Sequence, residues 1–226
     1  MTADQLWLKS VWPFVRDQIP PAPAMVLEIG CGPLGGFVPM LVDAGYDALG
    51  VDPQAPAGPL YRQVTFEQYE SLHQIGAAVA STSLHHVTDV GQVLDKIAAL
   101  IPGGAVVVVE WAWERVDEAT ARWCFDRLNR NVEPGWLSRR RDEWQDSGLS
   151  WDAYFTGWAT THGLHSSEVI RRELDKRFHC RLLTDGPYCF SDLADTTEAD
   201  EQAAIDAAAI RATAIRYVGE LPAAMA

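Results

Sequence analysis

Two carboxylates and two closely spaced glycines are the residues of this sequence best suited to bind a ligand. An apolar run over residues 24–29 leads directly into Gly30 and Gly32, and Glu28 stands two positions before the first glycine. Glycine lets the backbone turn sharply there and lets a ligand approach without meeting a Cβ. Asp52 ends the next apolar run, and a carboxylate at that place can accept hydrogen bonds from both ribose hydroxyls. The pattern predicts a nucleoside site.

Glu28 is the residue that distinguishes between nucleoside ligands. Gly30, Gly32 and Gly35 also match the G-x-G-x-x-G pattern of dinucleotide-binding proteins, so an NAD-dependent oxidoreductase is the main alternative. An acid at the carboxyl end of a strand suits a ligand with positive charge, such as an α-ammonium group, and is unfavourable beside a pyrophosphate. We therefore favour a cationic nucleoside over a dinucleotide. A tight turn without a ligand is the simplest structural alternative.

The same segment resembles the class I S-adenosylmethionine-dependent methyltransferases. Four motifs occur in the order that this family has, at residues 28–32, 50–53, 81–87 and 102–110. The resemblance covers residues 24–110, and more loosely the final strands. The family usually has G-x-G-x-G, whereas here Pro33 and Leu34 separate Gly32 from Gly35, so Gly35 or Gly36 would take the third place.

The resemblance implies a set of residues that contact S-adenosylmethionine. Gly30 and Gly32 would pass under the methionine part, and Glu28 would orient it. Ser81 would offer its backbone carbonyl to the ammonium group, and Asp52 would hold the ribose. The full predicted set is Glu28, Gly30, Cys31, Gly32, Asp52, Pro53, Glu67 and Ser81.

Two adjacent histidines are the predicted catalytic residues. Methyl transfer needs alignment and exclusion of water, and a general base helps when the acceptor is a hydroxyl. His85 and His86 follow the fourth predicted strand, where doubly wound sheets place their ligands, and histidine titrates near neutral pH. Glu110 is a second candidate base. The alternative is that the histidines only cap a helix or shape the loop.

A tryptophan-rich segment is the predicted cover of the substrate. Seven of the nine tryptophans lie between Trp111 and Trp158. We predict that Trp111, Trp113 and Tyr154 bind the substrate, since aromatic walls suit flat or apolar molecules and amines. The alternative is that most of these side chains form the core of a small lid. His162 and His165 lack a cysteine or carboxylate partner, so we expect no metal site.

The elements that position these residues predict an α/β fold. Hydrophobic periodicity and breakers indicate alternating strands and helices. Strands are expected at 24–29, 48–51, 63–66, 77–80, 106–109, 180–183 and 188–190, and helices at 4–18, 37–44, 90–100, 117–130, 138–147, 167–176 and 200–218, with Ser167 as a cap. The prediction is one domain over residues 1–226: a Rossmann-like, doubly wound, mostly parallel seven-stranded sheet, with residues 111–166 inserted after the fifth strand as a helical, Trp-rich lid.

The composition of the sequence indicates which kinds of molecule the protein binds and where it is located. The net charge of −13 disfavours nucleic acid as a partner, and the triplet Arg139–Arg141 is interpreted as a solvated helix face. We found neither a membrane-length apolar run nor a secretion signal, so we expect a cytoplasmic protein whose four cysteines are reduced thiols. The predicted function is methyl transfer to a small-molecule acceptor. A non-catalytic protein that binds S-adenosyl compounds is a further alternative.

Overall fold

A seven-stranded sheet forms the centre of the computed structural model, which describes residues 2–71, 74–128 and 135–221. The strand order is β3-β2-β1-β4-β5-β7-β6. Strands β1 to β5 are parallel, and β7 runs antiparallel between β5 and β6. The strands are β1 Met25–Ile29, β2 Asp47–Val51, β3 Tyr61–Arg62, β4 Ala77–Ser81, β5 Ala105–Trp111, β6 His179–Gly186 and β7 Ala214–Glu220. The predicted α/β class and mostly parallel sheet are confirmed.

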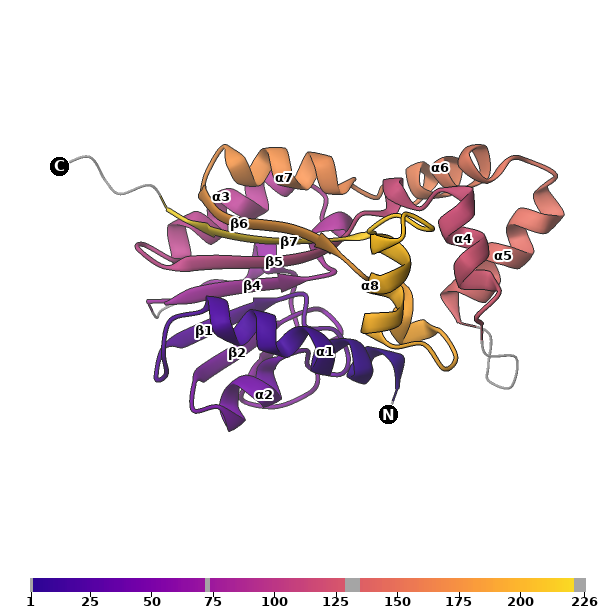
Figure 1. Cartoon of the computed structure of the whole chain (residues 1–226). Helices are drawn as coiled ribbons and strands as arrows, with labels where there is room; N and C mark the ends of the chain where they lie inside the picture. Colours follow the sequence, from indigo (N-terminus) through magenta and orange to yellow (C-terminus); the bar gives the residue numbers. More distant parts are fainter. Residues whose placement is uncertain (1, 72–73, 129–134, 222–226) are drawn as a thin grey trace.

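Helices cover both faces of the sheet, and three more lie beyond it in the segment predicted as a lid (Figure 1). Helices α3 and α7 cover one face, and α1 and α2 cover the other. The predicted lid, called the lid below, contains α4 to α6, which follow β5 at the carboxyl end of the parallel strands. The helices are α1 Ala3–Gln18, α2 Val38–Asp43, α3 Val90–Leu100, α4 Glu118–Phe125, α5 Trp136–Ser147, α6 Trp151–Thr161, α7 Ser167–Asp175 and α8 Glu198–Asp206; short 3-10 turns are η1 Phe66–Gln68, η2 Leu84–His86, η3 Trp113–Arg115 and η4 Cys189–Asp192. Among the described residues we found no helix with the length and apolar character needed to cross a membrane.

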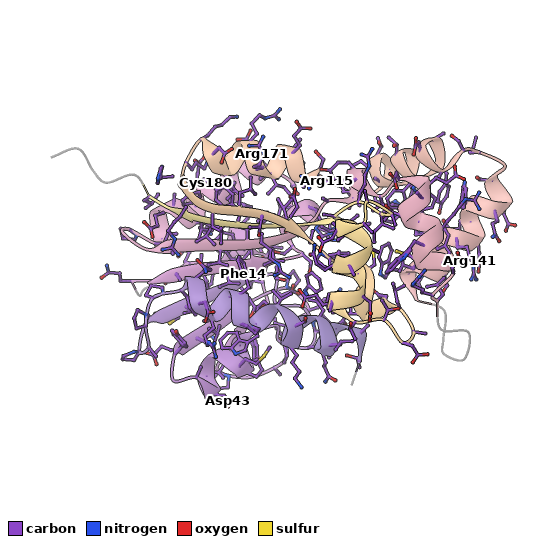
Figure 2. The ribbon with its side chains drawn as sticks, in the orientation of Figure 1. Phe14, Asp43, Arg115, Arg141, Arg171 and Cys180 are labelled. Carbon is purple, nitrogen blue, oxygen red and sulfur yellow. The ribbon has the colours of Figure 1, made fainter. Side chains whose placement is uncertain are left out.

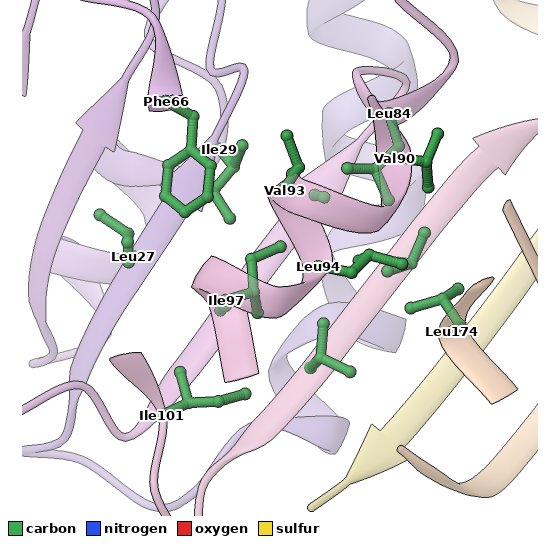
Figure 3. Packing of buried hydrophobic residues seen from close by; sticks show 14 of the residues in the cluster. Leu27, Ile29, Phe66, Leu84, Val90, Val93, Leu94, Ile97, Ile101 and Leu174 are labelled. Atoms are coloured by element: carbon green, nitrogen blue, oxygen red, sulfur yellow. The ribbon is translucent and has the colours of Figure 1, made fainter. Parts of the chain in front are cut away.

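The packing of α3 shows why the sheet edge is rigid (Figure 3). Asp89 caps the helix by accepting a hydrogen bond from the backbone N–H of Gln92 at 3.0 Å. Val90, Val93, Leu94 and Ile97 then recur at helical spacing, and all four are buried against β1, β4 and β5. Each such side chain contributes about 1.5–3 kcal/mol when fully buried. The loops at the carboxyl ends of these strands are therefore held by a packed layer.

Several local predictions were wrong. The third strand is Tyr61–Arg62 rather than 63–66, and residues 188–190 begin η4 instead of a strand. The helix predicted over 200–218 ends at Asp206, and β7 occupies Ala214–Glu220. Strand β7 is buried on both faces, so its residues do not alternate, and the preceding alanines have high helix propensity.

The helix ends also differ from the prediction. Helix α7 is capped by Ser166, whose hydroxyl accepts from the N–H of Val169, and not by Ser167. Helix α4 ends at Phe125, and residues 129 and 130 of the predicted helix lie outside the described part of the chain. Between residues 147 and 167 the sequence does not distinguish loop from helix, and the structure has α6 there.

A buried carboxylate on α8 attaches η4 to the rest of the fold. Glu201 is 1% exposed, and its carboxylate accepts hydrogen bonds from the backbone N–H groups of Tyr188, Cys189 and Phe190, at 2.9, 3.2 and 2.6 Å. Glu198 on the same helix bonds Ser10 of α1 and pairs with Arg216 of β7 at 2.7 Å. Helix α8 therefore joins α1, η4 and β7.

Removing the Glu201 carboxylate should destabilise the fold. Glu201→Ala leaves three backbone N–H groups without their acceptor, and each unsatisfied buried donor costs about 1–3 kcal/mol. We expect the free energy of unfolding in urea to fall by about 3 kcal/mol or more. The control is Asp206→Ala, an exposed acid on the same helix, which should change it by less than about 0.5 kcal/mol. Equal effects of the two variants would contradict this role.

Candidate active site

A cavity of about 850 Å³ lies at the carboxyl ends of β1, β2 and β4. Its walls also include residues from η1, from the start of α3 and from the first turns of α1. All eight residues predicted to bind the cofactor line it: Glu28, Gly30, Cys31, Gly32, Asp52, Pro53, Glu67 and Ser81. The topology therefore brings together residues that stand up to 53 positions apart in the chain.

The glycines of the first loop have different physical roles. Gly30 has φ +76°, and a Cβ there would lie 2.3 Å from the Cβ of Ser83, so this glycine makes room for protein. Gly32 has φ +63°, and its Cβ would meet no atom within 4 Å. Gly36 takes the place of a third glycine for another reason, because a Cβ there would overlap the carboxylate of Glu28. Only at Gly32 does the missing side chain leave open space.

Glu28 is buried and bonded to the start of α2. One carboxylate oxygen accepts hydrogen bonds from the backbone N–H groups of Phe37 and Val38, at 2.7 and 3.1 Å. Desolvation nevertheless raises the pKa of Glu28 to about 8, with a smaller contribution from the charge of Asp52. The side chain lines the cavity, so a cationic ligand beside it would favour the ionised form.

Asp52 is partly exposed at the end of β2. Its two carboxylate oxygens accept from the backbone N–H groups of Gly32 at 3.1 Å and Gln54 at 2.6 Å. Each oxygen of a carboxylate has two acceptor positions, so both keep one for a ligand hydroxyl. The bond to Gly32 also fixes the first loop relative to β2.

Ser81 has an unpartnered hydroxyl in the cavity wall. The side chain is 7% exposed, and its Oγ has no hydrogen-bond partner among the described residues. A buried hydroxyl without a partner is unfavourable unless a ligand or water satisfies it. The Ser81 hydroxyl, the open space at Gly32 and the two acceptor oxygens of Asp52 together fit a nucleoside that carries an amino-acid group.

The two predicted catalytic histidines have different surroundings. His85 is buried, and its Nδ1 lies 2.6 Å from Oε2 of Glu110. Oε1 of Glu110 accepts from the backbone N–H groups of Ser83 and Leu84, at 2.8 and 2.6 Å, which fixes the turn. His86 lines the cavity, and its ring centroid lies 4.1 Å from that of His85. Glu110 and His85 therefore position His86, which is the histidine exposed to a ligand.

A family model described as a methyltransferase domain matches residues 7–179. The chain belongs to this family. The match covers the sheet up to the start of β6, the cavity and the lid. It confirms the resemblance stated from the sequence and the expectation of a methyltransferase, in preference to an oxidoreductase.

Individual relatives are distant. A ubiquinone biosynthesis O-methyltransferase of Rhodopseudomonas palustris is 26% identical over an alignment of 162 residues. The match covers 66% of this chain and 59% of that protein, so it spans about three fifths of the curated relative. A crystal structure of an S-adenosylmethionine-dependent methyltransferase from Mesorhizobium loti has a TM-score of 0.57 and 18% identity, covering 94% of this chain and 99% of the other. Geranyl diphosphate C-methyltransferase from Streptomyces coelicolor, solved with S-adenosylhomocysteine, has a TM-score of 0.54 and 12% identity, covering 95% and 76%. These structures share the fold.

The three residues predicted to bind the substrate lie in the lid and not in the cavity wall. Trp111 is 5% exposed and packs among lid aromatics, with its ring stacked on Tyr188 at 5.6 Å. Trp113 donates from Nε1 to the carbonyl of His165, and Tyr154 donates to Glu143 at 3.0 Å. None of the three lines the 850 Å³ cavity. The aromatic segment mainly forms the core of the lid, and substrate contact by these residues stays a prediction.

The arginine triplet of the lid is only partly a solvated face. Arg141 pairs with Asp142 at 2.8 Å and lies on α5 at the far right of Figure 2. Arg140 is buried, and its guanidinium stacks over Trp158 at 4.5 Å from the ring centroid. The amphipathic pattern of α5 was too weak to reveal that one arginine faces inward.

The first helix supplies cavity residues that sequence reasoning missed. Asp4, Trp7 and Leu8 of α1 line the same cavity as Asp52 and His86. The periodicity placed Trp7 on the buried face of the helix but could not show which part of the fold that face covers. The unusual position of a tryptophan in the first two turns was the only available signal.

The pKa of Glu28 should give stability a characteristic pH dependence. Its folded-state pKa of about 8 is above the ordinary value of 4.5, so the folded form keeps a proton that the unfolded form loses. Stability from this group is therefore full below pH 4.5, declines as pH rises to 8, and is constant above that. Glu28→Gln should remove the decline.

The measurement is urea unfolding of both proteins without ligand between pH 5 and 8. The variant's free energy of unfolding should rise relative to the wild type with increasing pH, by at most about 1.4 kcal/mol per pH unit. A difference that is independent of pH would show that Glu28 is ionised in the free protein.

Proposed function

We propose that this protein transfers a methyl group from S-adenosylmethionine to a small-molecule acceptor bound in the 850 Å³ cavity. The observation that carries the proposal is the convergence of Glu28, Gly32, Asp52 and Ser81 on one cavity that also contains His86. Membership of the methyltransferase-domain family supports it.

The residues of the chain bind and orient the donor. S-adenosylmethionine supplies a methyl group on a positively charged sulfur, which keeps the bonding electron pair when the methyl leaves. Asp52 accepts hydrogen bonds from the ribose hydroxyls, and Gly32 leaves space for the chain that connects ribose to the amino acid. Glu28 gives the wall a group that ionises beside positive charge, and Ser81 supplies a polar contact. The protein thus contributes alignment and desolvation.

His86 is the residue that takes the proton which the methyl acceptor loses. Desolvation, followed by the neighbouring His85, lowers the pKa of His86, so its imidazole is neutral at pH 7. A neutral imidazole has a free acceptor nitrogen. The pair of Glu110 and His85 holds the turn that carries this ring, so the base is fixed relative to the cavity.

The identity of the methyl acceptor and the cellular location of the protein are predictions. The name of the curated relative specifies an oxygen acceptor in ubiquinone biosynthesis, which is consistent with a small molecule as the acceptor here. The excess of acidic residues favours partners other than nucleic acid, and a cytoplasmic location is the expectation from the sequence.

Calorimetric titration with S-adenosylhomocysteine and with NAD tests the donor assignment. We expect S-adenosylhomocysteine to bind and NAD to bind at least about a hundredfold more weakly, because a pyrophosphate would lie beside Glu28 and Asp52. Tighter binding of NAD would overturn the proposal.

Asp52→Ala should weaken the binding of S-adenosylhomocysteine by tenfold or more. Hydrogen bonds to a charged group contribute about 1.5–3 kcal/mol, and the variant removes those to the ribose. The control is Asp47→Ala at the opposite end of β2, which should leave the affinity unchanged. Both affinities can be measured by calorimetry at one pH, and an unaltered affinity of Asp52→Ala would refute ribose binding by this residue.

His86→Ala should slow turnover while it preserves donor binding. The variant removes the proton acceptor but leaves the contacts of Glu28 and Asp52 intact, so kcat should fall at least about a hundredfold, the lower end of the range of general base catalysis. The affinity for S-adenosylhomocysteine should stay within about twofold. His179→Ala, an exposed histidine on β6, is the control. If turnover and donor binding fall together, His86 has a structural role.

A further inference from the structure

The part of the cavity formed by α1 has its own polar groups. Trp7 is 7% exposed and lines the cavity, and its indole Nε1 has no hydrogen-bond partner among the described residues. Asp4 lies one helical turn earlier and lines the same cavity with an exposed carboxylate. One helix face therefore carries a buried N–H donor that no described residue pairs with and an exposed carboxylate acceptor.

This helix is held in place by contacts with α8 and with the segment that contains η4. Ser10 bonds Glu198 of α8, and the ring of Trp7 packs against Tyr188 and Phe190, with centroids 5.0 and 5.8 Å away. Phe66 and Glu67 reach the cavity from the sheet face covered by α3, whereas α1 reaches it from the opposite face (Figure 1). Trp7 is thus a fixed group on the side of the cavity away from η1.

Carboxylates are the main charged side chains of the cavity wall. Its acidic residues are Asp4, Glu28, Asp52, Glu67 and Asp89, and no lysine or arginine is among the described residues that line it. The negative charge of Asp4 also acts behind Trp7. Burial is the main cause of the raised pKa of Tyr188 and of Asp192, and the charge of Asp4 adds to it in both. Burying a further anion here without a cation to pair it would be costly.

These groups discriminate between three common kinds of ligand. A carboxylate could accept from Trp7 but would face several acids and no cation. An ammonium group would suit the acids, but it has no lone pair and would leave the indole N–H unpaired. A hydroxyl both accepts and donates, so it can pair with Trp7 and with Asp4 or His86.

We propose that the α1 end of the cavity binds an uncharged, hydroxyl-bearing small molecule, with Trp7 Nε1 donating to its hydroxyl oxygen and Asp4 excluding anionic analogues. The inference rests on the proposed function, because this molecule is the methyl acceptor. It makes Trp7 and Asp4 the residues that determine specificity.

The experiment observes the indole N–H of Trp7 directly. Protein with ¹⁵N-labelled tryptophan gives indole N–H signals from nine residues, and Trp7→Phe identifies the signal of Trp7 by its loss. With saturating S-adenosylhomocysteine, the protein is titrated with matched compounds that share one skeleton and differ in whether they carry a hydroxyl and in whether they also carry a carboxylate or an ammonium group. 4-Ethylphenol, 4-hydroxyphenylacetate, tyramine and ethylbenzene form one such set.

The neutral hydroxyl compounds should shift the Trp7 signal and bind at least about fivefold more tightly than their charged or hydroxyl-free partners, as expected from one net hydrogen bond. Preferential binding of carboxylates or ammonium compounds, or no shift of the Trp7 signal with any compound, would overturn the proposal.

Two variants and one control variant test whether Trp7 and Asp4 recognise the ligand or only support the fold. Trp7→Phe keeps an aromatic ring and should weaken binding of the hydroxyl compounds about fivefold. Asp4→Asn is on the surface and should instead improve binding of the carboxylates. Trp123→Phe, on α4 outside the cavity, should change neither. An Asp4→Asn variant that treats carboxylates as the wild type does would contradict the role of Asp4.

The affinity for S-adenosylhomocysteine distinguishes the two proposals. It should be within about twofold of the wild type in all three variants. Loss of this binding in the wild type would refute the proposed function. Normal donor binding without preference for hydroxyl compounds would refute only the inference about the acceptor.

Discussion

Buried carboxylates that accept hydrogen bonds from backbone N–H groups organise the edge of the sheet where the cavity lies. Glu28 bonds the start of α2, Glu110 bonds the turn after β4, and Glu201 bonds η4. Each supplies an acceptor for backbone N–H groups at the start of a helix or 3-10 turn. Removing a carboxylate from water is costly, so the arrangement depends on these N–H groups to stabilise the buried charge or its protonated form.

The same residues give the cavity its electrostatic character. Because loops are attached through acids and not through lysine or arginine, the walls around the ligand space contain only negative or neutral groups. That environment suits a sulfonium donor, and the charge of Asp52 adds to the burial that raises the pKa of Glu28 in the free protein. Structural and functional uses of acidic side chains are therefore combined at this edge.

Tyr188 contacts aromatic side chains of the lid and of α1, and these two groups differ in whether they reach the cavity. Trp111 stacks on Tyr188 from the lid, whereas Trp7 contacts it edge-on from α1. Four lid tryptophans contact Phe155, and none of them lines the cavity: Trp111, Trp113, Trp151 and Trp158. Trp7 has the cavity on one side, so it alone among these aromatic residues combines a packed ring with a wall of the ligand space.

The sequence by itself determined the class of fold, the nucleoside loop and the acidic ends of β1 and β2. These features follow from local constraints: glycine at positive φ, apolar runs of strand length, and carboxylates placed directly after them. Strand β7 was not recognised, because a strand buried on both faces has no alternation and this one follows an alanine-rich helix. The tertiary structure alone decided that His86 and not His85 faces the cavity, that Gly30 makes room for Ser83, and that α1 completes the wall. Those outcomes depend on contacts between segments distant in the chain, whereas local patterns show only that a residue is buried and not what it is buried against.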